Sequence, residues 1–359
     1  MHPPVFRRFL FGAALLIVMF RQASISPAAE TPAAKTRDEV NAAIAEAGRT
    51  HPGWWSGVKL DFPNTLQLDW SGGGKASPDY RMALYLDERI YPNPSRWTSG
   101  VRLLHHCVEV NGQKPSALRK SQFELAEAYR LLLGDYARAA YWYLQAKEHI
   151  AVGLAECYRR LGNKQMAVEV LDKHARDDTR DGEVVTMWAA IGDLDRGLKL
   201  AEDMVRRNRP TSGNLAAALA CMAAGEFGKA KAYLNKVLTA QTDRRNWHAG
   251  FDRQRAKVYL DALTKVPNFD LTKAADGTYT GTGRGYKGPV TVEVTLRSHA
   301  IASVRVTRHR ENRARNSIGA VPVRIVHGGS PAVHAVSGAT VTSNAIVEAT
   351  AAAIAKAMR

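Results

Sequence analysis

The stretch DGTYTGTGRGYKGPVTVEVTLRSHAIASVRVTRHREN, residues 276–312, differs sharply in pattern from the chain before it. Apolar and polar residues alternate with a period of two, threonine and valine are frequent, and no helical stripe is present. This alternation predicts an antiparallel sheet of about three strands. Residues 343–358 return to helical spacing, with a shared apolar face at Ile346, Ala349, Ala353, Ile354 and Ala357. We therefore expect residues 270–359 to form a small α+β domain.

Residues 117–265 repeat around a glycine turn. The turn glycines are Gly134, Gly162, Gly192 and Gly225. A small residue follows each glycine five positions later, namely Ala139, Ala167, Gly197 and Ala230. Glycine ends a helix in a left-handed turn, and a small residue lets the next helix approach closely. The segment resembles degenerate tetratricopeptide-type repeats and predicts an all-α helical-hairpin array for docking a partner. A helical spacer without a partner is the alternative.

A chain of 359 residues is long enough for two or more folding units, so we expect a multi-domain protein. Residues 37–116 form a mixed region of unknown role, with helices expected over 37–47 and 99–110. Trp54, Trp55 and Trp70 are expected to pack against the helices that follow. A binding cleft lined by these indoles is the alternative.

The N-terminus has the pattern of an export signal. Arg7 and Arg8 precede an apolar run over residues 9–20, and small residues follow at 26–29. We therefore expect a signal peptide over residues 1–29 and a linker over 30–36. The apolar run is too short to span a bilayer comfortably, which favours a cleaved leader over a membrane tether. The predicted location is the periplasm or the outer face of the cytoplasmic membrane.

The formal net charge of +16 favours acidic protein partners or an anionic membrane surface, and export argues against nucleic acid. Cys107, Cys157 and Cys221 are too few and too scattered for a disulfide framework, so buried thiols are expected. We predict no metal site, because no paired Cys/His spacing occurs, and no catalytic constellation.

The glycines Gly283, Gly285 and Gly288 satisfy the spacing GxGxxG. A dinucleotide site needs a helix after this motif, but the strand-like run PVTVEVTL follows it. A hairpin or bulge is therefore expected, open to close approach by a ligand.

Five blocks in fixed order carry a family resemblance: DGTYTG, GYKGPVTVEV, VRVTRHREN, VPVRIV and SGATVTSNAI. The region from Asp276 to about Ala357 resembles the FMN-binding domain family. That family includes the periplasmic flavin subunits of the sodium-translocating NADH:quinone reductase and of the Rnf complex. The resemblance implies FMN as cofactor, esterified through its phosphate to Thr340 by a flavin transferase that uses FAD and a divalent metal.

The residues around Thr340 suit that role. Gly338 and Ala339 remove side-chain bulk, so that the hydroxyl can enter another active site. Hydroxyl donors are supplied by Ser337, Thr342 and Ser343. A helix expected to start near Ser343 would direct backbone N–H groups at the phosphate. A helix cap without a ligand is the alternative.

Position 334 departs from the family pattern. His334 stands where the family commonly has an acidic residue that the transferase reads. This departure weakens the expectation of covalent attachment more than that of flavin binding.

The resemblance also assigns His309 and Glu311 to the site, within a dense basic run: Arg305, Arg308, His309, Arg310, Arg313 and Arg315. These cations could pair with the FMN phosphate or favour reduced flavin. Protection of a strand edge by charge is the alternative. Tyr279 and Tyr286 are expected to be buried in the sheet, with stacking on a flavin as the alternative.

The sequence thus predicts an exported FMN-binding flavoprotein that transfers electrons rather than an enzyme with its own substrate. Its partner would be a redox protein or a membrane electron-transport complex, docked by the helical array. One alternative is a non-redox scaffold whose C-terminal domain has lost flavin. Another is a flavin enzyme acting on a small organic acceptor, for which residues 37–116 would have to supply the substrate domain.

Overall fold

The computed structural model describes residues 33–71, 77–147, 150–174, 181–242, 248–311, 317–335 and 339–358. The predicted signal peptide, residues 1–29, lies outside these ranges. No helix within them is both long and apolar enough to cross a membrane.

The N-terminal region consists of two longer helices with short helical turns between them. Thr36 and Glu39 form a reciprocal capping box that starts the first helix, which extends two residues beyond the predicted end. Just before it, the backbone N–H of Lys35 donates to the carbonyl of Gly162 at 3.0 Å, which ties the start of the described chain to a repeat turn. The elements are α1 (Arg37–Arg49), η1 (Trp55–Gly57), α2 (Met82–Tyr85), η2 (Leu86–Ile90), η3 (Pro94–Arg96) and α3 (Trp97–Val110).

The array consists of antiparallel helix pairs, as predicted. The helices are α4 (Pro115–Ala128, continued by the π-helical turn η4, Tyr129–Leu133), α5 (Tyr136–Ala146), α6 (Ala151–Arg160), α7 (Lys164–His174), α8 (Asp181–Ala190), α9 (Leu194–Arg206), α10 (Pro210–Ala223), α11 (Phe227–Thr239) and α12 (Ala249–Lys265). All four predicted turn glycines have a left-handed backbone, with φ between 62° and 94°. Three of the small residues after them, Ala139, Ala167 and Ala230, are fully buried. At the fourth, a Cβ on Gly197 would lie 2.7 Å from the Val185 carbonyl oxygen.

The C-terminal domain follows the short turn η6 (Pro267–Phe269). Its sheet has the order β1 (Gly277–Arg284), β2 (Pro289–Arg297), β3 (Ala300–Arg308), all antiparallel. The inner face of β2 buries Val290, Val292, Val294 and Leu296, whereas threonines occupy much of the outer face. This confirms the predicted antiparallel α+β domain.

The C-terminal helix α14 (Thr340–Ala357) packs across β1 and β2. All five residues of its predicted apolar face are buried. The helix and β1 approach backbone to backbone, because a Cβ on Gly281 would lie only 1.9 Å from the Ala349 carbonyl oxygen, and one on Gly283 2.1 Å from that of Ala345. Gly283 therefore allows the helix to pack closely on the strand. The sequence had predicted only a hairpin or bulge at this glycine.

Two features of this domain differ from the sequence prediction. Helix α14 begins at Thr340, three residues before the predicted start, and the hydroxyls of Thr342 and Ser343 bond to the Glu311 carboxylate and the Ala339 carbonyl instead of capping the helix. A further helix, α13 (Ser317–Gly328), was not predicted, since Pro322 inside it is an unfavourable residue for a helix interior.

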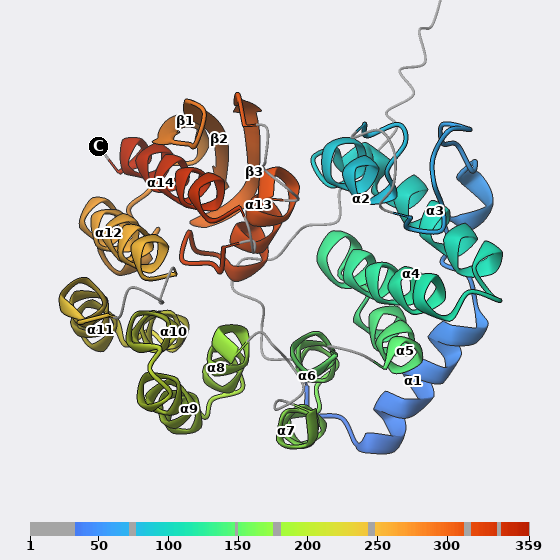
Figure 1. Ribbon diagram of the computed structural model, residues 1–359, viewed down its shortest axis with the longest axis horizontal. Coiled ribbons are helices and arrows are strands. Elements are labelled where there is room, and N and C mark those ends of the chain that lie inside the picture. Colours follow the sequence, from blue (N-terminus) through green and yellow to red (C-terminus); the bar gives the residue numbers. More distant parts are fainter. Residues whose placement is uncertain are drawn as a thin grey trace, which may run out of the picture.

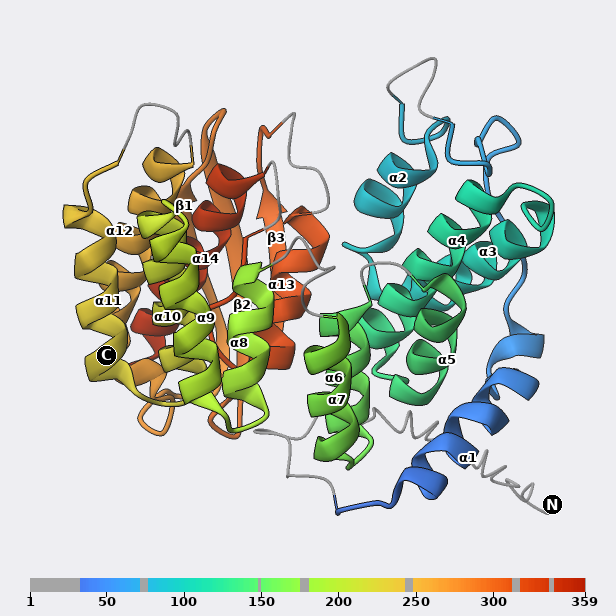
Figure 2. The same ribbon diagram turned by 60° about the horizontal axis from the view of Figure 1, so that its bottom comes forward.

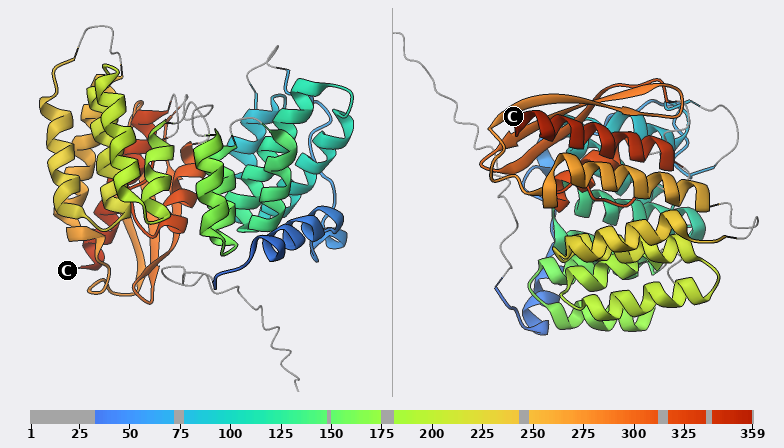
Figure 3. Two further views of the ribbon diagram at one scale, coloured as in Figure 1. Left: turned by 90° about the horizontal axis from the view of Figure 1, so that it is seen from below. Right: turned by 90° about the vertical axis from the view of Figure 1, so that its left-hand side faces the viewer.

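The array and the C-terminal domain pack against each other. Figure 1 shows the helices from α3 to α12 as an arc, with the C-terminal domain lying over its α12 end. Seen from the side in Figure 3, the sheet, α14, α12 and the remaining array helices lie in successive layers. Helix α13 reaches the N-terminal region, where it contacts both π-helical turns, η2 and η4. Thus the domain is held at both ends of the arc.

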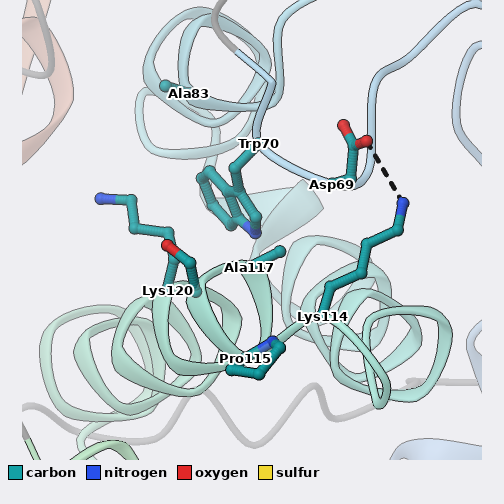
Figure 4. A pocket seen from close by; sticks show the side chains of 8 residues that line it. Asp69, Trp70, Ala83, Lys114, Pro115, Ala117 and Lys120 are labelled. Atoms are coloured by element: carbon teal, nitrogen blue, oxygen red, sulfur yellow. Dashed lines mark hydrogen bonds and ion pairs between the residues drawn. The ribbon is translucent and has the colours of Figure 1, made fainter.

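The predicted indole packing is confirmed for Trp54 and Trp70, which are partly buried against the N-terminal core. Trp70 also lines a hollow of about 580 Å³ between α2 and α4 (Figure 4). The Lys120 ammonium lies 5.4 Å from the Trp70 ring centroid, and Lys114 pairs with Asp69 at 3.3 Å. The three cysteines are free and buried, as predicted.

Candidate functional site

Among the residues that the structure describes, no side chain at the N-cap position caps the N-terminus of α14. Its N-cap residue, Ala339, has no side-chain oxygen to accept a bond from the amides of the first turn. Thr340 is the first helical residue and is partly exposed, while Ala339 beside it is buried. The first-turn N–H groups and the positive end of the helix dipole therefore favour an anion here.

Glu311 joins this helix to the turn between β1 and β2. Its carboxylate accepts the backbone N–H groups of Tyr286 at 3.1 Å and of Lys287 at 2.8 Å. The hydroxyl of Thr342 donates to the same carboxylate. Glu311 thus holds the hairpin turn against the first turn of α14. Gly285 makes room for it, because a Cβ there would lie 2.7 Å from a Glu311 oxygen.

Two buried polar residues follow in the first turns of α14. The Ser343 hydroxyl donates to the Ala339 carbonyl at 2.9 Å. Asn344 is only 2% exposed, and its side-chain nitrogen Nδ2 has no hydrogen-bond partner within the described part of the chain. Because Asn344 lies four residues after Thr340, both occupy one face of the helix. A buried, unsatisfied donor is costly and is expected where a ligand completes the site.

The segment that leads to α14 is held by the array. The imidazole Nε2 of His334 lies 2.7 Å from the Thr186 hydroxyl on α8, and Arg324 of α13 donates to the His334 carbonyl at 3.1 Å. The hydroxyl of Tyr259 on α12 donates to the Val333 carbonyl. Figure 2 shows α8 beside α13, where these contacts form. Burial lowers the pKa of His334 to about 4, so this imidazole is neutral near pH 7.

The remaining predicted site residues either lie outside the described residues or lie apart from the contacts around Glu311. Ser337 and Gly338, and Arg313 and Arg315 of the basic run, lie outside the described residues. His309 is exposed just after β3 and forms no part of the contacts around Glu311 described above.

The basic and aromatic residues near the hairpin turn are largely exposed. Arg305 pairs with Glu293 at 2.8 Å on the outer sheet face, whereas Arg308 and Arg310 are exposed at the end of β3. The expectation that Tyr286 is buried was wrong. It is 57% exposed, because its hairpin turn projects beyond the paired strands.

A comparison with protein families identifies this region. Residues 285–355 match the family described as the FMN-binding domain. The C-terminal domain is an FMN-binding domain. The match includes Glu311, Thr340, Thr342, Ser343 and Asn344, and it confirms the predicted cofactor, FMN. No curated protein and no solved structure was found to match the chain.

The residues of the FMN-binding domain fit a phosphate-bearing cofactor. Among the described residues, they provide helix-terminal amides that the N-cap residue Ala339 does not cap, the partly exposed hydroxyl of Thr340 and the unsatisfied Nδ2 of Asn344. Sequence reasoning missed Asn344, because an amide in an alanine-rich helix carries no distinctive pattern. It also missed Thr186, which lies 148 residues from His334 in the chain.

Proposed function

We propose that this flavin-binding protein is an exported electron-transfer protein whose FMN is esterified through its phosphate to Thr340. The observation that carries the proposal is the FMN-binding family match, which includes Thr340 at the uncapped N-terminus of an 18-residue helix. FMN supplies chemistry of one- or two-electron transfer, and the protein binds, orients and electrically tunes it.

The chain's own residues have separate roles in this proposal. The first-turn amides of α14 hold the phosphate, and Asn344 donates a hydrogen bond to the cofactor from the same helix face. Glu311 keeps the hairpin turn at Tyr286 and Lys287 in place beside the helix. The exposed cations Arg308 and Arg310 stabilise the negative charge of the FMN phosphate or of reduced flavin.

Attachment would occur during maturation by a flavin transferase. The Thr340 hydroxyl oxygen forms a bond to the phosphorus of the FMN part of FAD, the bond to the AMP phosphate breaks, AMP leaves and the hydroxyl proton passes to solvent. Ala339 has only a methyl side chain, which leaves room for the transferase to reach the Thr340 hydroxyl. The predicted leader would deliver the chain to the periplasm, where a redox protein or a membrane electron-transport complex exchanges electrons with it.

The experiment compares the wild-type protein with Thr340→Ala and Thr340→Ser, each purified after export in a host that contains the transferase. We expect the visible absorption of oxidised flavin in wild type and retention of flavin after acid precipitation. Thr340→Ala should release its flavin into the acid supernatant. Thr340→Ser, which keeps a hydroxyl, is the matched control and should retain at least part of it.

The outcomes separate the parts of the proposal. Acid-released flavin in wild type would overturn the covalent link alone. A colourless wild-type protein that takes up no added FMN would overturn flavin function and favour the scaffold alternative.

A further inference from the structure

The contact between α8 and His334 is a specific hydrogen bond. The Thr186 hydroxyl donates to the Gly182 carbonyl at 3.1 Å in its own helix. A hydroxyl has one hydrogen, so in this arrangement it accepts from His334 at 2.7 Å. This arrangement corresponds to the imidazole tautomer with the proton on Nε2.

Three elements converge on two consecutive residues of this segment. Thr186 on α8 binds the His334 side chain, Arg324 on α13 binds its carbonyl, and Tyr259 on α12 binds the Val333 carbonyl. The charged groups around the imidazole are Glu183 of α8, Arg255 of α12 and Arg324 of α13. Two of the three elements belong to the helical array rather than to the FMN-binding domain.

Val333 and His334 are therefore bonded to the array and to α13, and Thr340, six residues after His334, is the first residue of α14. Helix α14 itself packs on β1, β2 and α12. Loss of either set of contacts would let Thr340 and the first-turn amides leave the orientation that binds a phosphate. A binding-competent state that is only partly populated weakens apparent affinity by the same fraction.

We infer that α8 and α12 dock Val333 and His334 of this same chain, and that Thr186 and His334 are positioning residues for the FMN phosphate. The array then completes the flavin site instead of only adjoining it. This inference rests on the proposed function, because it assigns a position to the same phosphate.

The test measures FMN binding to the full-length apoprotein by titration, with the visible circular dichroism of the bound flavin as a second readout. Thr186→Val keeps the side-chain shape and removes the hydroxyl. We expect its dissociation constant for FMN to rise about 5- to 30-fold, as for loss of one buried hydrogen bond. Thr186→Ser should restore wild-type binding. His334→Phe, which removes the donor by another route, should weaken binding to a similar degree.

Two controls separate a positioning role from a general loss of protein stability. Thr239→Val removes a hydroxyl that bonds the carbonyl four residues earlier in α11, as Thr186 does in α8, and should leave FMN binding unchanged. The double variant Thr186→Val/His334→Phe should bind no more than about twofold more weakly than either single variant, because both remove one interaction.

Folded Thr186→Val and His334→Phe proteins with wild-type affinity and an unchanged flavin spectrum would overturn the inference while leaving the proposed function intact. Wild-type protein that carries no flavin after export with the transferase and also binds no added FMN would overturn both. Should Thr186→Val fail to fold, His334→Phe decides by the same criteria.

Discussion

The two halves of the helical array use the same turn chemistry but are stabilised differently. The helices before α8 build a core with the N-terminal region, and its fully buried side chains include Tyr129, Tyr143 and Leu125. The helices from α10 onward share a core with the sheet and α14, where alanine and valine predominate. The repeat spacing thus specifies helix pairs, but the neighbour of each pair decides how it is buried.

This difference has a structural consequence. In the first half, bulky side chains separate the backbones, and the ion pair of Arg130 and Glu127 is buried among them. In the core that the second half shares with the sheet and α14, the backbones of β1 and α14 touch directly at Gly281 and Gly283. The following predictions test that contrast, beginning with the largest expected effect.

The buried polar group of the first half should be sensitive to the loss of one charge. Arg130 pairs with Glu127 at 2.8 Å and donates to the Tyr143 hydroxyl at 2.9 Å, and both charged side chains are under 20% exposed. Arg130→Met should lower the free energy of unfolding by about 3–5 kcal/mol, because a buried carboxylate loses its cation. Urea unfolding with hydrogen exchange over α4 and α5 measures this.

A surface pair provides the control for that variant. Arg49→Gln breaks an exposed bridge to Glu46 and should change stability by less than about 1 kcal/mol. Equal effects of Arg130→Met and Arg49→Gln would show that the buried group does not stabilise the first half.

The backbone contact between β1 and α14, in the core that the second half shares with the C-terminal domain, should not tolerate a methyl group. In Gly281→Ala the new Cβ would meet the Ala349 carbonyl, so β1 and α14 must separate. We expect a loss of about 1–3 kcal/mol from overpacking, measured as a lower urea midpoint. In Gly228→Ala the Cβ enters open space, and this control should leave stability equal or slightly higher. A Gly281→Ala protein as stable as wild type would contradict the close contact.

Acid should destabilise the protein through two buried histidines, His105 in α3 and His334 in the C-terminal domain. Burial lowers the pKa of His105 to about 3 and that of His334 to about 4, against 6.5 for an ordinary histidine. Between pH 6.5 and these values the unfolded chain binds a proton that the folded chain does not, so stability falls as the pH falls. The slope is about 1.4 kcal/mol per pH unit for each histidine. His105→Gln and His334→Gln should each flatten it, and an unchanged slope would contradict the burial of that imidazole.

The smallest effect is expected at the carboxylate beside the candidate site. Glu311→Gln keeps one acceptor for the amides of Tyr286 and Lys287 and loses the other. We expect a loss of about 1 kcal/mol and faster hydrogen exchange at these two amides. Glu293→Gln, on the outer sheet face, is the matched control and should leave their exchange unchanged.

Local patterns predicted much of the fold. The alternation over residues 276–312 predicted the sheet, and the turn glycines predicted the helix pairs, because each signal arises from neighbours in the chain. Helix α13 escaped because Pro322 hides its helical spacing. The start of α14 was misplaced because Thr342 and Ser343 resemble cap residues until their partners, Glu311 and the Ala339 carbonyl, are known.

The candidate site was predicted in outline from the family blocks around Thr340. The role of His334 could not be read from its sequence neighbours, because its partner Thr186 comes from another folding unit. Asn344 could not be recognised either, since only burial shows that its amide lacks a partner.

The most direct test of the account is mass spectrometry of the full-length protein purified after export together with a flavin transferase. The account predicts a mass increase of one FMN less water, located by fragmentation on Thr340 and lost in Thr340→Ala. An unmodified chain that also binds no added FMN would contradict it.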